Sequence, residues 1–186
     1  MKIKLVVIML CVVAVCIGFI VYLKADFWSR EEQLTGLKFK GEVLFESHDK
    51  GRDGYSVWIE RIPDIVLSQM RAISYQLERY PKNCALENDG YRLVRWTACS
   101  KISSETQRRL QYILIHESDD KLSVAGNVED IKTIGDARVF ASQLMQTKGN
   151  FYSYFFKESD FAGTTGVFFY LIDFDKALLL MIAVKT

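Results

Sequence analysis

Few residues of this 186-residue chain have the type and spacing that chemistry requires. The two histidines, His48 and His116, lie far apart, one in an expected turn and one near an expected helix end, where a cation favours the helix dipole. Asp173 and Asp175 could act as paired carboxylates, but their position between two apolar runs favours the polar end of a hairpin. No nucleophile elbow, phosphate-binding glycine loop or His-Glu-x-x-His sequence occurs. We therefore expect no enzyme, no cofactor and no metal site.

Two cysteines, Cys84 and Cys99, lie outside the apolar N-terminal segment. Their spacing is not Cys-x-x-Cys and no histidine lies near them in the sequence, which disfavours the alternative of metal or redox chemistry. In an oxidising compartment a lone pair of cysteines usually forms a bridge. We predict a structural disulfide between Cys84 and Cys99, worth about 3 kcal/mol in the chain-entropy model.

The segment Leu5–Leu23 contains no charged residue. As a helix rising ~1.5 Å per residue it would be about 28 Å long, close to the ~30 Å hydrocarbon core of a bilayer. The alternatives are a buried core helix or a cleaved signal peptide, although a signal peptide is shorter and Leu23-Lys24-Ala25 is a poor cleavage site. Lys2 and Lys4 precede the segment without an acidic residue, so this end stays in the cytoplasm. The sequence predicts an uncleaved, single-pass anchor in a bacterial inner membrane, with the rest of the chain in the periplasm.

The charge balance is close to neutral, with 24 basic and 23 acidic residues and no basic stripe, which disfavours nucleic-acid binding. We expect a cytoplasmic tip and transmembrane anchor over residues 1–24, a juxtamembrane linker or helix over 25–36, and one periplasmic domain over 37–186. Gly36 is the expected end of the juxtamembrane helix.

Alternating and helical periodicities predict an α+β fold in that domain. Two strands form an expected hairpin, one strand stands alone, and three consecutive strands form an antiparallel meander. The expected strands are Leu37–Glu46, Tyr55–Ile62, Tyr91–Thr97, Phe151–Lys157, Gly166–Asp173 and Ala177–Lys185. The expected helices are Pro63–Tyr80, one from a cap at Ser103 or Ser104 to about His116, and Asp136–Gln146. The last strand is apolar on both faces, so we expect it to be central or covered by helices. The sheet either stays open or curls into a barrel, with two or three helices packed on it.

The last third of the domain is rich in aromatic residues, with ten of the chain's 24 between Phe151 and Phe174. One interpretation is a well-packed core, and the other is an apolar cavity or a surface for a partner. Tyrosine rings suit surfaces that are apolar at one end and wet at the other. Strand alternation selects Tyr152, Tyr154 and Phe169 as candidates for a partner or ligand surface, with Phe169 the weakest because we expect its whole strand to be buried.

Several segments, in order, resemble one known family. They are Asp26-Phe27, Glu32-Gln33-Leu34-Thr35, Gly54–Arg61, Gly90-Tyr91-Arg92-Leu93-Val94 and Lys101-Ile102-Ser103-Ser104. The layout is similar to the ToxS group of inner-membrane accessory proteins, which assist a transmembrane transcription activator. The resemblance implies a non-enzymatic periplasmic domain that contacts the activator, shields it from proteolysis and supports signalling. In related pairs the two domains form a barrel that takes up bile-type amphiphiles. Cys84, Cys99 and the aromatic region depart from the family pattern.

The favoured function is thus a membrane-anchored interaction protein whose partner is another membrane protein, with a hydrophobic small molecule as a further ligand. The alternatives are a periplasmic immunity or inhibitor protein, a component of a secretion or pilus assembly machine, and an enzyme with an unrecognised site.

Overall fold

The computed structural model describes residues 30–49, 54–72, 77–81, 90–114, 126–159 and 163–185. Within these ranges no helix is long and apolar enough to cross a bilayer. The predicted anchor Leu5–Leu23, Cys84 and His116 lie outside them.

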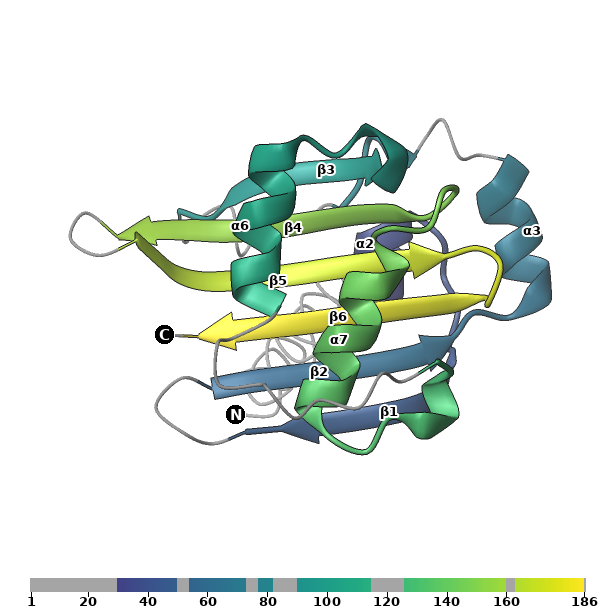
Figure 1. Cartoon of the computed structure of the whole chain (residues 1–186). Helices are drawn as coiled ribbons and strands as arrows, with labels where there is room; N and C mark the ends of the chain where they lie inside the picture. Colours follow the sequence, from purple (N-terminus) through teal and green to yellow (C-terminus); the bar gives the residue numbers. More distant parts are fainter. Residues whose placement is uncertain are drawn as a thin grey trace, which may run out of the picture.

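The described residues form an α+β fold around a six-stranded antiparallel sheet (Figure 1). Its strand order is β1-β2-β6-β5-β4-β3. The strands are β1 (Glu42–His48), β2 (Gly54–Arg61), β3 (Arg92–Ala98), β4 (Phe151–Ser159), β5 (Gly163–Asp173) and β6 (Leu178–Lys185). The predicted hairpin is β1–β2 and the predicted meander is β4–β5–β6, so both are confirmed. The sheet is open, with β1 and β3 at its edges, and the alternative of a barrel is wrong for this arrangement.

The central strands have two apolar faces because their side chains alternate across the sheet. In β5, Phe169 belongs to one core cluster and Tyr170 to the other. In β6, Leu180 belongs to the same cluster as Phe169, and Leu179 belongs to the same cluster as Tyr170. The prediction that the last strand is central is confirmed, since β6 lies between β2 and β5. Each face of such a sheet needs its own cover of helices.

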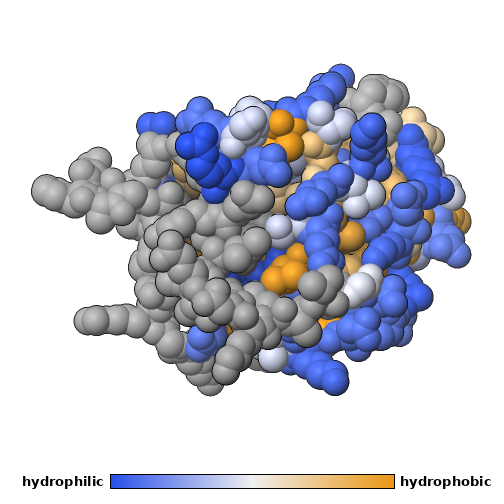
Figure 2. Space-filling view, viewed as in Figure 1, coloured by the Kyte–Doolittle hydropathy of each residue, from blue (hydrophilic) through white to orange (hydrophobic). Residues whose placement is uncertain are grey.

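Two helices, α6 (Ser104–Leu114) and α7 (Ile134–Leu144), cover the front face in Figure 1. The hydroxyl of Ser103 accepts a hydrogen bond from the Thr106 amide at 3.1 Å, so Ser103 is the N-cap of α6. A capping box begins α7: the Thr133 hydroxyl accepts from the Asp136 amide, and the Asp136 carboxylate accepts from the Thr133 amide. These caps fix where the two helices begin. The outer surface of this layer is mostly hydrophilic in the described part (Figure 2).

The back face is covered by α2 (Arg30–Thr35) and, at one end of the sheet, by α3 (Asp64–Ala72). The Trp96 indole donates a hydrogen bond of 2.7 Å to the carbonyl of Leu34 in α2. Gly36 ends α2 at a φ of 76°, as predicted, and a side chain there would overlap the ring of Tyr80. These contacts hold α2 against the sheet.

The hairpin's first strand begins later than predicted, at Glu42 instead of Leu37. Leu37 and Phe39 pack against the back core instead of continuing the β1 ladder. Gly41 lies so close to β2 that an added Cβ would be 2.7 Å from the Arg61 carbonyl oxygen. The alternating apolar residues that predicted a longer strand thus lie in a segment that precedes β1 and covers the back core.

Candidate functional site

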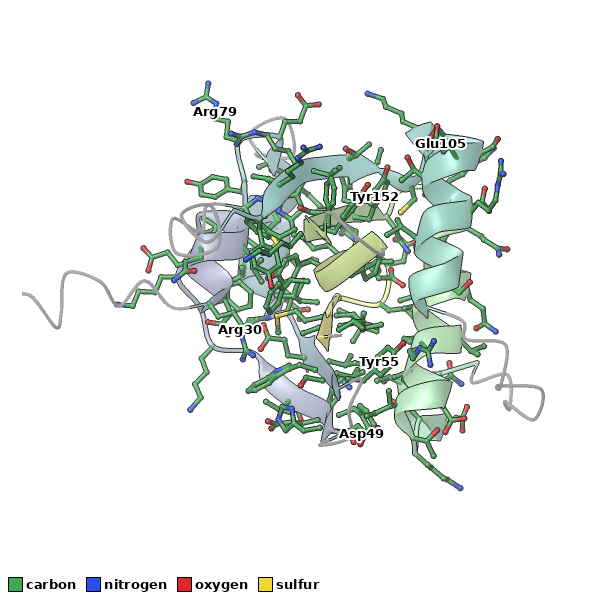
Figure 3. All side chains as sticks on the ribbon, turned by 90° about the vertical axis from the view of Figure 1, so that its left-hand side faces the viewer. Arg30, Asp49, Tyr55, Arg79, Glu105 and Tyr152 are labelled. Atoms are coloured by element: carbon green, nitrogen blue, oxygen red, sulfur yellow. The ribbon has the colours of Figure 1, made fainter. Side chains whose placement is uncertain are left out.

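The aromatic residues selected from the sequence lie in the front core. Tyr152, Tyr154 and Phe169 have exposed fractions of 3%, 5% and 0%. Tyr152 and Tyr154 stack with their ring centroids 6.4 Å apart, and Figure 3 places Tyr152 between the sheet and α6. Burial raises the pKa of Tyr152 to about 12, so its hydroxyl stays protonated at neutral pH. The three side chains therefore belong to the front core, under the layer that contains α6 and α7. Their predicted role as a partner or ligand surface stays a prediction.

Cys99 is also in the front core, with an exposed fraction of 4%, and no other described cysteine is bonded to it. Burial, with a smaller effect of Asp173, raises the pKa of the Cys99 thiol to about 12. A thiol this basic is a poor nucleophile at neutral pH. Cys84 lies outside the described residues, so the bridge to Cys99 stays a prediction.

The predicted polar end of a hairpin is confirmed at Asp173. Its Oδ1 accepts hydrogen bonds from the amides of Asp175 and Lys176 at 2.9 and 3.0 Å. Asp173 is buried and shapes the turn between β5 and β6. The described residues contain no group of three or more His, Cys, Asp or Glu side chains able to hold a metal ion.

A partly open apolar pocket of about 300 Å³ lies across β2, β6 and β5. Its apolar side chains Trp58, Phe168, Tyr170 and Met181 belong to the back core cluster or pack against it. Register brings them together, because Trp58 pairs with Met181 and Met181 pairs with Tyr170 across neighbouring strands. This volume is at the small end of the range for ligand pockets.

The rim of the pocket is polar and carries a cation. The Arg30 guanidinium from α2 lies 3.5 Å from the centre of the Trp58 ring, a cation–π contact. His48, at the end of β1, also lines the pocket, and its Nε2 is 2.9 Å from an oxygen of Glu46. Figure 3 shows Arg30 on the side of the sheet opposite to α6 and Tyr152. An apolar interior with a guanidinium at its rim can hold an apolar molecule or side chain that carries an anionic group.

Next to this pocket, Glu60 is buried in β2 with an exposed fraction of 2%. Burial, and then the neighbouring Glu31 carboxylate, raise the pKa of Glu60 to about 7, against smaller lowering effects of Arg30 and Trp58. The lowering effect of Trp58 comes from its indole N–H, which is directed at the Glu60 carboxyl group in a weak hydrogen bond. A carboxyl group of this kind is half protonated near neutral pH.

The sequence reasoning missed Arg30, Trp58, Phe168, Tyr170 and Met181 as members of one site. The alternation of side chains shows which face of its own strand Trp58 or Phe168 occupies, but not which strands are neighbours. The two residues line one pocket because β6 pairs with both β2 and β5, and this long-range pairing has no local signal in the sequence.

Comparisons with family models, with curated proteins and with solved structures found no match to this chain. The resemblance to the ToxS group therefore stays a prediction.

Proposed function

We propose that this chain is a membrane-anchored periplasmic interaction protein without catalytic activity. In this proposal it stabilises or modulates another inner-membrane protein, such as a transmembrane transcription activator, and takes a hydrophobic, amphiphilic small molecule. The observation that carries the proposal is the apolar pocket beside α2, since an apolar surface rimmed by polar groups is typical of partner and ligand sites.

The position of α2 supports a partner in the membrane. Arg30 follows the predicted anchor by seven residues, counted from Leu23. Even a fully extended chain, at ~3.3–3.6 Å per residue, keeps Arg30 within about 25 Å of the end of such an anchor. The pocket that Arg30 lines would then lie close to the membrane surface, where another inner-membrane protein can contact it.

The experiment compares the inner-membrane proteome of cells with and without this chain. We expect the level of one membrane protein to fall in the deletion strain and to return with the wild-type chain. Ala183→Trp, which fills the pocket, should fail to restore it, while Glu129→Trp on the exposed helix η2 (Val128–Asp130) should restore it fully. An unchanged proteome, or full restoration by Ala183→Trp, contradicts the proposal.

A further inference from the structure

Three buried polar atoms at the junction of α2 with β2 make no hydrogen bond of full geometry with any described residue: Arg30 Nε, Trp58 Nε1 and Glu60 Oε1. Their nearest interactions are weak ones, between Arg30 and Glu31 and between Trp58 and Glu60. The three atoms make up most of the buried side-chain atoms of this kind in the described part of the chain. Nearly all buried polar groups in folded proteins are satisfied, so each exception needs a reason. Here the exceptions gather where a short helix meets the sheet, beside the buried carboxyl group of Glu60.

The charges around Glu60 do not balance when its carboxyl group is ionised. From α2, Arg30 and the largely buried Glu31 face it, and Arg30 Nε lies 3.6 Å from Glu31 Oε1. From the sheet, the register partners of Glu60 are the apolar Val43 and Leu179. The Arg30 guanidinium is therefore the one cation placed to balance two carboxylates, those of Glu31 and Glu60, among the described groups that act on Glu60.

The other charged groups on the neighbouring segments are exposed or have a different partner. Lys38 and Lys40, in the segment that covers Glu60, are exposed. At the end of β2, Arg61 pairs with Glu42 at 3.5 Å. Backbone covers the carboxyl group, since a Cβ added at Gly41 would be 3.0 Å from the Glu60 carboxyl carbon. Water has little access to relieve the repulsion.

We propose that Glu60 is a proton-controlled latch that holds the N-terminal turn of α2 on the sheet. With its proton, Glu60 is neutral and Arg30 pairs with Glu31 alone, so the turn stays docked. When the O–H bond of Glu60 breaks and the proton passes to water, two carboxylates compete for one guanidinium, and the turn moves away to let water reach Glu60.

The pKa of Glu60, raised to about 7, places this change in the neutral range. The C-terminal part of α2 stays attached, because Leu34 is buried and its carbonyl accepts the hydrogen bond from Trp96. Release of Arg30 also removes the cation from above Trp58 and widens the pocket on that side. The latch goes beyond the proposed function, because it requires neither a partner nor a ligand.

The test is hydrogen exchange of the α2 amides in the full chain, in detergent micelles, between pH 5.5 and 8.5. The Leu34 amide is the best reporter, because in a helix that begins at Arg30 it donates to the Arg30 carbonyl. After correction for the intrinsic pH dependence of exchange, we expect protection to fall at least tenfold, with a midpoint near pH 7. Glu60→Gln should keep full protection across the range.

Two further variants separate Glu60 from other titrating groups. His48→Gln should show the wild-type profile, which excludes the described histidine near the pocket as the cause. Glu31→Gln removes the repulsion, so its fall should be smaller and its midpoint lower. The proposal is overturned if wild-type protection does not change with pH, if the fall survives in Glu60→Gln, or if Glu31→Gln leaves the profile unchanged.

Discussion

Replacing Glu60 by glutamine should stabilise the chain at alkaline pH and change little at acidic pH. The physical reason is that the folded chain retains a proton that the unfolded chain loses. The pKa of the carboxyl group rises from 4.5 to about 7 on folding. Between these values the folded state binds more protons than the unfolded state, so the free energy of unfolding falls as pH rises.

The size of the effect follows from that shift. At ~1.4 kcal/mol per pKa unit the wild-type chain loses at most about 3 kcal/mol between pH 4.5 and pH 8. Glutamine has almost the same shape and no titration, so it avoids this loss. If α2 moves away at high pH, water reaches Glu60, and the measured difference is smaller, about 1–2 kcal/mol.

The assay is urea unfolding of the full chain in micelles, followed by tryptophan fluorescence at pH 5, 6, 7 and 8. The quantity of interest is the unfolding free energy of Glu60→Gln minus that of the wild type, because other titrating groups cancel in it. This difference should increase with pH and level off above about pH 7. The same difference for Glu129→Gln, an exposed carboxylate, should stay flat. A difference for Glu60→Gln that is independent of pH would refute the reasoning.

Three further predictions concern the docking of α2, the cysteines and the anchor. Gly36→Ala should lower stability by about 2–3 kcal/mol in urea unfolding, because φ is 76° and Tyr80 occupies the space of the side chain; a loss below about 0.5 kcal/mol contradicts this. Thiol labelling of the unfolded, unreduced protein should find neither Cys84 nor Cys99 free, and a serine at either position should cost about 2–4 kcal/mol; labelling of both disproves the bridge. An alkaline phosphatase fusion at Thr186 should be active and the protein should keep its N-terminus, whereas a shorter soluble form in the periplasm would mean cleavage.

Local patterns predict most of the secondary structure because alternation and caps are properties of neighbouring residues. The apolar faces of β6 predict a strand that is central or covered by helices, and it is central. Of the two caps predicted for α6, Ser103 or Ser104, the structure has Ser103. Leu37 and Phe39 mislead, because an alternating segment can cover a core as well as pair with a strand.

The site was not predictable in the same way. Alternation groups Tyr152 with Tyr154, but it does not say that α6 and α7 cover their face. The pocket depends on Trp58 and Phe168 lying two strands apart, which only the strand order determines. Burial of Glu60 depends on Gly41 from a covering segment. Such long-range pairings leave no periodic signal in the sequence.

The central claim is that the pocket face contacts another inner-membrane protein, and crosslinking in living cells tests it most directly. A photoreactive amino acid is placed at Ser56 or Ala183, which line the pocket, or at Glu105 on α6, which Figure 3 places on the opposite side. We predict that both pocket positions capture the same membrane-spanning protein, whose level also falls when this chain is deleted, and that Glu105 does not capture it. Equal capture from Glu105, or no capture from either pocket position in a folded protein, would contradict the account.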